Sequence, residues 1–334
     1  MDVFDELLRG VRGKGAVFGR SVLYPPWSLR FADGAYLTLC VPLRGAGWIV
    51  PEGGGAPYRV GLGEAAIVRG PAPFLFTDEP ATGAGTGTGT GPGPGASVRE
   101  VRLPDGRPDE GPSDDDELTG PTVLLAATYD VRAEVPQRLL RVLPPVLVVP
   151  DDHDCTAMRD YLEAQIAGVR PGRQIVLDRL LDWLLVCTLR DWFDRPEADP
   201  PKWYRALGDE VAGPALRAMH EDPAHPWTTA ALATRAGVSR TTLAKRFTEI
   251  VGEAPVAYLT EWRMTLAADL LTRPELTVGA VARRVGYADA FGFSAAFKRL
   301  RGESPSAYRR AAGSLPHPER QGREERGERE APAG

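Results

Sequence analysis

The chain has 334 residues and a formal net charge of −5, from 40 Lys and Arg against 45 Asp and Glu. No stretch approaches the ~20 apolar residues of a membrane-spanning helix, and residues 1–14 lack the basic start and apolar run of a signal peptide. The three cysteines are widely spaced without metal-ligand patterning, which indicates free thiols in a reducing compartment. We therefore expect a cytoplasmic protein, long enough for two domains.

Short apolar segments separated by Gly and Pro fill the first 77 residues. This pattern is typical of a small antiparallel barrel or sandwich. Strand character resumes at residues 122–129, and residues 139–149 are expected to pack back toward it. The other predicted strands are residues 15–24, 36–43, 47–50, 58–60 and 65–68.

A low-complexity segment at residues 77–120 interrupts the strand pattern. Residues 81–97 are almost entirely Gly, Ala, Thr, Pro and Ser, and residues 104–117 are acidic and polar. Neither composition buries enough apolar surface to fold. We therefore predict one disordered insertion in a loop of a barrel that spans residues 1–150.

Two helices are expected after the barrel, at residues 155–170 and 174–193, within a helical region at 151–193. The second helix is apolar around more than half of its girth. Such a helix has to be covered, either by the barrel or by its copy in a second subunit. A stiff, proline-containing polar linker is expected at residues 194–204.

A seven-residue sequence motif occurs twice near the end of the chain, as GEAPVAY at 252–258 and GESPSAY at 302–308. The two copies are 50 residues apart and identical at five of seven positions. Apolar residues before each copy repeat at the same offset, namely Leu243 with Phe293 and Phe247 with Phe297. This self-similarity indicates two tandem copies of one small helical unit.

Each copy has the pattern of two helices joined by a tight turn. In the first, Gly237 supplies the left-handed turn position and Ser239 caps the following helix; Gly286 and Asp289 take these places in the second. Helix, turn, helix is the motif whose second helix is shaped to enter a major groove of DNA. A long helix expected at 255–272 would fix the separation of the copies, so that both second helices meet one face of a duplex.

Charge is distributed unevenly along the chain. Residues 225–312 carry 13 Lys and Arg against 7 Asp and Glu, whereas residues 1–200 carry 20 against 29. Only the C-terminal part has the positive excess that neutralisation of phosphates requires. An excess of this size also occurs on ordinary surfaces, so it supports a nucleic-acid partner without establishing one.

A spaced set of residues in the second copy comprises Gly286-Tyr287, Phe293-Ser294, Phe297-Lys298-Arg299, Gly302, Ser304-Pro305 and Tyr308-Arg309. Their order, spacing and duplication resemble the signature of the AraC/XylS family of bacterial transcription regulators. The resemblance covers residues 205–312 and implies a DNA-binding domain there, with double-stranded DNA as partner. A helical bundle with no nucleic-acid role is the alternative. Residues 313–334, rich in Arg, Glu, Gly and Pro, are expected to form a disordered tail.

Four short N-terminal segments resemble the cupin-like sensor domains of a bacterial branch of the same family. These are residues 17–20, 27–31, 143–147 and 177–181. The resemblance covers residues 1–200 and implies a barrel followed by helices, with an effector pocket inside the barrel. It also favours a homodimer through the helical region.

Candidate pocket residues are Trp27, Arg30, Tyr36 and Trp48, because aromatic rings and one cation suit a small, partly polar ligand. The aromatic residues equally fit an ordinary core, and Arg30 fits a surface charge. A metal-dependent cupin enzyme needs His and carboxylate ligands gathered on facing strands, but none of the four histidines lies in a predicted strand. We therefore predict no metal, no cofactor and no catalytic residue.

Helical geometry assigns roles on DNA to the outward residues of the second helix of each copy. Lys245 is expected to donate to guanine, and Thr241 to touch a base edge or a thymine methyl. The predicted base contacts are Thr241, Ala244, Lys245, Phe291 and Ser294. The predicted backbone contacts are Ser239, Arg240, Arg246, Lys298, Arg299 and Arg301. Each side chain, taken singly, also fits a solvated surface position.

The second copy departs from the family pattern at Ala295, where the family usually has Arg. The first copy is therefore expected to supply most base specificity, and the second to supply backbone contacts plus an apolar contact from Phe291.

The predicted fold class is α+β multidomain, with a cupin-like β-barrel, flanking helices and an all-α double helix-turn-helix domain. The corresponding function is a sequence-specific DNA-binding transcription factor of AraC/XylS type that responds to a small molecule and is not an enzyme. The alternative is a cupin that binds or converts a small molecule and uses its helical domain for assembly. The missing His cluster argues against catalysis, and the basic tandem repeat argues against a role in assembly alone.

Overall fold

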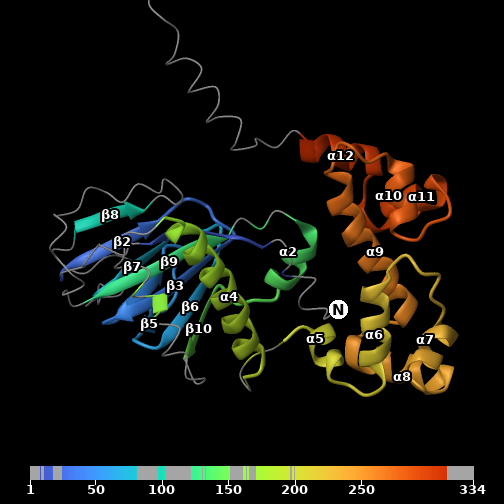
Figure 1. Cartoon of the computed structure of the whole chain (residues 1–334), viewed down its shortest axis with the longest axis horizontal. Helices are drawn as coiled ribbons and strands as arrows, with labels where there is room; N and C mark the ends of the chain where they lie inside the picture. Colours follow the sequence, from blue (N-terminus) through green and yellow to red (C-terminus); the bar gives the residue numbers. More distant parts are fainter. Residues whose placement is uncertain are drawn as a thin grey trace, which may run out of the picture. The chain divides into compact units, whose positions relative to one another are not determined.

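The structure is a computed structural model, and its described chain forms two compact units (Figure 1). The described residues are 8, 11–17, 25–80, 97–101, 122–129, 131, 133–150, 161–162, 164, 171–195, 198 and 200–313. The N-terminal unit takes its residues from 8–132 and 136–200. The C-terminal unit takes its described residues from 133–135 and 201–313.

The strands of the N-terminal unit form two five-stranded sheets in the described part of the chain. In order, the first sheet contains β1 (Gly13–Val17), β9 (Val123–Tyr129), β3 (Leu37–Arg44), β6 (Glu64–Arg69) and β10 (Val146–Pro150). The second contains β5 (Tyr58–Val60), β4 (Gly47–Pro51), β7 (Phe74–Thr77), β2 (Trp27–Phe31) and β8 (Ser97–Val101). Neighbouring strands are antiparallel except β2 and β8, which are parallel.

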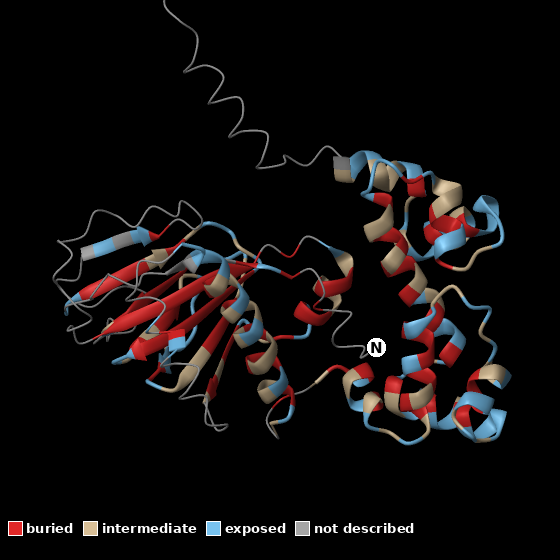
Figure 2. Ribbon diagram, viewed as in Figure 1, coloured by how far each residue is buried: buried red, intermediate tan, exposed pale blue. Residues whose placement is uncertain are grey.

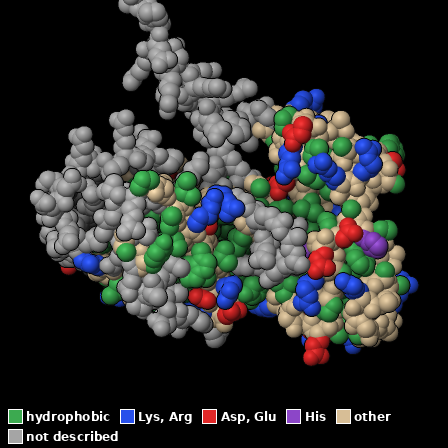
Figure 3. Space-filling model, in the orientation of Figure 1, with side chains coloured by type: hydrophobic (Ala, Val, Ile, Leu, Met, Phe, Trp, Pro, Cys, Tyr) green, Lys and Arg blue, Asp and Glu red, His purple; other side chains and the backbone are tan. Residues whose placement is uncertain are grey.

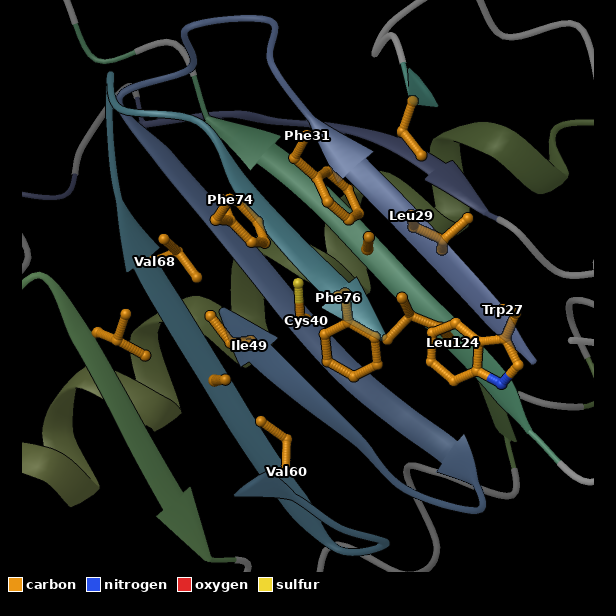
Figure 4. Close-up of a cluster of buried hydrophobic side chains, with 14 residues drawn as sticks. Trp27, Leu29, Phe31, Cys40, Ile49, Val60, Val68, Phe74, Phe76 and Leu124 are labelled. Atoms are coloured by element: carbon orange, nitrogen blue, oxygen red, sulfur yellow. The ribbon is translucent and has the colours of Figure 1, made fainter. Parts of the chain in front are cut away.

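Apolar side chains from the inner faces of both sheets form the core of this unit (Figure 4). Two stacked aromatic pairs lie in it: the ring centroids of Phe31 and Phe74 are 4.7 Å apart, and those of Trp27 and Phe76 are 5.7 Å apart. The two sheets are not hydrogen-bonded to each other along the described strands. Of the barrel or sandwich that the strand pattern predicted, they therefore form the sandwich, and the cupin-like barrel is not closed. The three-residue β5 pairs with β4 alone and is therefore an edge strand of the second sheet; it also packs against β6 and β10 of the first sheet.

The helix α4 (Arg173–Phe193) covers the other face of the first sheet. Leu177, Leu181 and Leu185 are fully buried and repeat every four residues, so they lie on one side of the helix. The Tyr129 hydroxyl donates a hydrogen bond to the carbonyl of Leu181 at 2.7 Å. Strand β3 is consequently buried on both faces. The short helix α2 (Glu134–Leu140) lies between β9 and β10 in the sequence.

The C-terminal unit is wholly helical in its described residues (Figure 2). Helices α5 to α8 pack together, and α10 to α12 pack around the end of the long α9. The helices are α5 (Lys202–Leu207), α6 (Ala212–Glu221), α7 (Thr229–Arg235), α8 (Arg240–Val251), α9 (Pro255–Leu271), α10 (Val278–Arg284), α11 (Ala290–Arg301) and α12 (Pro305–Gly313). None of the described helices combines the length and apolar character needed to cross a bilayer.

The strand at 58–60 has the predicted bounds. Strands β2 and β7 were not predicted, because prolines precede both and are typical of loops. Strand β8 lies within the predicted insertion, so the prediction of disorder is wrong for these five residues, which gain pairing with β2. Helix α5 likewise begins inside the predicted linker. Residues 81–96 and 102–121, most of the helix predicted at 155–170, and residues 314–334 of the expected tail lie outside the described residues.

Candidate nucleic-acid interface

The first helix-turn-helix unit consists of α7, a turn and α8. Thr228 and Ser239 cap the two helices, each hydroxyl accepting a backbone N–H of the first turn at 3.1 Å. Gly237 has φ +69°, the left-handed conformation predicted for the turn. Leu243 and Phe247 are completely buried, so the opposite face of α8 is turned to solvent.

The second unit repeats this construction with α10 and α11. Thr277 caps α10 at 3.1 Å, and the carboxylate of Asp289 accepts two N–H groups of α11 at 2.8 and 2.9 Å. Gly286 has φ +85° in the turn. Phe293 and Phe297 are completely buried, as their counterparts are in α8. The predicted duplication and caps are confirmed.

The helix α9 contributes to the cores of both units. In its first half, Tyr258 shares a 2.8 Å hydrogen bond with His220 of α6, and Trp262 lies with its ring centroid 4.2 Å from that of His220. In its second half, Met264 belongs to the buried cluster that contains Phe293. One rigid helix therefore links the two units.

Arg263 of α9 links the two helix-turn-helix units. Its guanidinium donates to the carbonyl oxygens of Pro223 and His225, in the loop before α7, at 2.7 and 2.8 Å. The same group lies 6.0 Å from the ring centroid of Tyr287, in the turn of the second unit. Arg263 thus connects the loop that precedes the first helix-turn-helix unit with the turn of the second.

Gly286 lies against the same loop. A Cβ atom on Gly286 would be 2.6 Å from the carbonyl oxygen of Ala224, closer than real Cβ atoms approach, whereas a Cβ on Gly237 would meet no atom within 4 Å. The two glycines share a left-handed conformation, but only Gly286 has a neighbouring backbone pressed against it. These contacts hold the two units in a fixed relation.

The solvent-facing side of α8 carries the residues predicted to contact bases. The Lys245 side chain is 78% exposed, with its ammonium 4.0 Å from the carboxylate of Glu249. Thr241 and Arg240 are exposed, and Ala244 is half-buried between them and the core. The structure brings these four residues together on one surface.

Two residues predicted to contact the DNA backbone are engaged within the unit. The Ser239 hydroxyl caps α8, and the Arg246 guanidinium donates two hydrogen bonds to one carboxylate oxygen of Asp209, at 2.7 and 2.9 Å. The other oxygen of Asp209 accepts two N–H groups at the start of α6. Burial alone would raise the pKa of Asp209, but these N–H groups and Arg246 hold it below its ordinary value.

On α11, the Phe291 side chain is 87% exposed. The Ser294 hydroxyl is half-buried and donates to the carbonyl of Ala290 at 2.7 Å, so its proton is committed to the helix. Lys298 and Arg299 are exposed. Phe291 and Ser294 occupy the outward positions that the sequence predicted.

Arg301 is turned inward at the end of α11. Its side chain is only 22% exposed and donates to the Thr265 hydroxyl of α9 at 3.1 Å. The prediction left out Arg283 and Arg284, which are exposed in the last turn of α10. The signal for both was present as paired basic residues at a helix end. Lys and Arg side chains are visible across the C-terminal unit in Figure 3.

The four candidate pocket residues are not brought together in the N-terminal unit. Trp27 lies in the sandwich core, and among the described residues its indole Nε1 has no hydrogen-bond acceptor. Arg30, three residues further along the same strand, donates two hydrogen bonds to the Glu52 carboxylate, at 2.5 and 2.9 Å. The Tyr36 side chain is 40% exposed and Trp48 is half-buried. Within the described part of the chain, no three His, Cys, Asp or Glu side chains cluster as a metal site would require.

Comparison with known proteins agrees with this architecture. A family model described as Cupin matches residues 2–194, and one described as Helix-turn-helix domain matches residues 232–311. An AraC-like transcription regulator of Streptomyces lividans is 30% identical over 317 residues, which cover 93% of this chain and 98% of that protein. The chain belongs to the AraC-like transcription regulators. The family and fold class predicted from the sequence are thereby confirmed.

An AraC-like transcription regulator of Streptomyces antibioticus also matches 93% of this chain, whereas two other similar proteins match one part of it. The transcriptional regulator AlkR of Acinetobacter baylyi is 38% identical over 149 residues, 45% of this chain and 48% of that protein. The crystal structure of the DNA-binding domain of AdpA, a global transcriptional factor, in complex with a target DNA is 33% identical. It covers 31% of this chain and 93% of that chain, with a TM-score of 0.30.

Proposed function

We propose that this AraC-like regulator binds specific sites on double-stranded DNA by placing α8 and α11 in two successive stretches of major groove on one face of the duplex. The observation that carries the proposal is the fixed pair of capped helix-turn-helix units, joined by α9 and by the Arg263 contacts. Each unit turns its second helix to solvent. In this function the protein catalyses no reaction and binds DNA in the cytoplasm.

The contacts divide by chemistry. Lys245 and Thr241, with Ala244 between them, contact base edges from α8. Arg240, together with Lys298 and Arg299 of α11, contacts phosphates. Ser239, Arg246 and Arg301 act by holding the helices in place, because their polar groups already have partners within the unit.

Selection from a pool of random DNA tests this function. The full chain should enrich a common sequence, and its affinity for that sequence should fall steeply with salt, since each phosphate contact adds about 0.9 to the slope of log affinity against log salt. Recovery of no common sequence, or an affinity insensitive to salt, would contradict the proposal.

The N-terminal unit is proposed to sense a small molecule. Trp27 is the one predicted pocket residue in the sandwich core, so an effector entering between the sheets would be largely apolar and carry an acceptor for the indole N–H. A screen of metabolites by thermal shift tests this. An effector should raise the melting temperature of the wild type by more than it raises that of Trp27→Phe. The substitution keeps an aromatic ring but removes the indole N–H donor.

A homodimer through α4 is also proposed. One side of α4 packs on the sheet, whereas a second apolar side, which includes Leu180 and Leu184, is only half-buried. Trp183 is 40% exposed and Ile175 is 66% exposed on the same helix. A second copy of α4 would cover this side and remove its apolar area from water.

A further inference from the structure

The two outward helices of the DNA-binding unit present opposite chemistry at equivalent positions. With the 50-residue offset, the first two turns of α8 and α11 align residue by residue. A polar or charged side chain of α8 is replaced by an apolar one of α11 at three aligned, solvent-exposed positions, which are Arg240 and Ala290, Thr241 and Phe291, and Lys245 and Ala295. The two helices therefore cannot recognise bases by the same contacts.

Phe291 is the most prominent of these apolar residues. It is 87% exposed in the first turn of α11, where residues of such helices meet base edges. Its backbone N–H is held by the Asp289 carboxylate at 2.9 Å, so the position of its Cα is fixed by the cap. The neighbouring Gly292 has no side chain to screen the ring from a partner. Moving an exposed aromatic ring from water into a contact that excludes water is favourable, in proportion to the apolar area buried.

On the described outward face of the first two turns of α11, Ser294 is the only side chain near Phe291 that carries a hydrogen-bond donor. Ala290 and Ala295 offer only methyl groups, and the Ser294 hydroxyl proton is committed to the carbonyl of Ala290. One carboxylate oxygen of Asp289, Oδ1, accepts the two N–H groups at the start of the helix, and a carboxylate has no proton to donate. In a major groove, the apolar feature that such a surface can contact is the C5-methyl group of thymine.

We infer that Phe291 is a specificity-determining residue that recognises thymine through its 5-methyl group, so that α11 reads methyl groups while α8 reads hydrogen-bonding edges. This inference rests on the proposed binding of DNA and identifies the chemistry read by the second unit. It predicts an operator in which one or two thymines lie under α11, with guanine under Lys245.

Replacement of single thymines by deoxyuridine tests the inference, because it removes the methyl group and keeps every hydrogen-bonding atom. The selected DNA site is synthesised with one deoxyuridine at a time, and the affinity of the full chain is measured by fluorescence anisotropy. Wild type should lose about three- to five-fold in affinity at one or two thymines, the change expected for one methyl group removed from contact. Phe291→Ala should bind thymine and deoxyuridine equally at those positions.

Two variants serve as controls. Thr241→Ala, at the aligned position on α8, should keep the wild-type ratio of thymine to deoxyuridine affinity at the thymines assigned to α11. Leu300→Ala removes another exposed apolar side chain from the far end of α11 and should keep it too. Either a wild type indifferent to every deoxyuridine, or a Phe291→Ala variant with the wild-type ratio, would overturn the inference.

The outcomes separate this inference from the proposed function. Selection of a salt-sensitive site that is indifferent to deoxyuridine would overturn the role of Phe291 and leave DNA binding intact. In that case the exposed ring would fit a protein partner instead. Failure to select any site would overturn both.

Discussion

Replacing Gly286 by Ala perturbs the contact that holds the two helix-turn-helix units together. The residue has φ +85°, and an L-residue in this left-handed conformation costs about 1–2 kcal/mol. The added Cβ would also lie 2.6 Å from the oxygen and 2.9 Å from the Cα of Ala224. Backbone has to move to relieve this overlap, which adds about 1–3 kcal/mol. The expected loss of unfolding free energy is the sum of the two effects.

Gly237→Ala is the matched control, because Gly237 occupies the same turn position in the first unit. Its φ is +69° and no atom would meet its Cβ within 4 Å, so only the conformational cost of about 1–2 kcal/mol applies. Hydrogen exchange of α9 and α11 in the full chain, followed over a urea series, measures the unfolding free energy of this part. We expect Gly286→Ala to lose about 1–3 kcal/mol more than Gly237→Ala. Equal losses of unfolding free energy in the two variants would refute the claim that the turn of the second unit packs closely against the loop before the first.

Three further predictions concern base reading, acid stability and assembly. Lys245→Ala should reduce discrimination against single base changes by about 1–3 kcal/mol. Ser294→Ala should not, and equal losses in fluorescence anisotropy on mutated sites would contradict this division. Asp209→Asn should lower the unfolding free energy by about 1 kcal/mol at pH 7, because Arg246 is half-exposed. Folding lowers the pKa of Asp209, so its contribution is present above the unfolded pKa of about 4 and is lost as pH falls through the folded value. The difference in unfolding free energy between the two proteins, measured by urea titration, should therefore shrink as pH falls below about 4. A difference that stays constant would exclude the Asp209 carboxylate as its source. Trp183→Glu should weaken dimerisation at least about ten-fold by charging an apolar interface, and an unchanged sedimentation equilibrium would contradict a dimer through α4.

The features that the sequence predicted best depend on local chemistry. A capping side chain and a left-handed glycine act within a few residues of the turn they stabilise, so Ser239, Asp289, Gly237 and Gly286 could be identified without any tertiary information. The repeat strengthened this reading, because two independent copies obeyed the same rules. The outward position of Phe291 follows in the same way from helical periodicity.

The features that escaped prediction depend on distant contacts. Arg246 reads as a surface charge until Asp209, 37 residues earlier, is seen to accept its hydrogen bonds. Arg263 likewise lies on a helix whose sequence gives no sign of the loop that it binds 38 residues away. In the N-terminal unit, Arg30 follows the inward-facing Leu29 on strand β2, and the alternation of the strand turns it away from the core toward Glu52. Its place in a pocket could not be judged before the strand itself was known.

The central claim is that two units held rigidly by α9 read two successive major-groove segments of one site. Inserting five base pairs between the two halves of the selected site tests it most directly, since half a helical turn moves one segment to the opposite face of the duplex. The account predicts that affinity falls at least about 100-fold and that a ten-base-pair insertion, which restores the face but exceeds the reach of α9, does not recover it. Affinity unchanged by the five-base-pair insertion would contradict the account.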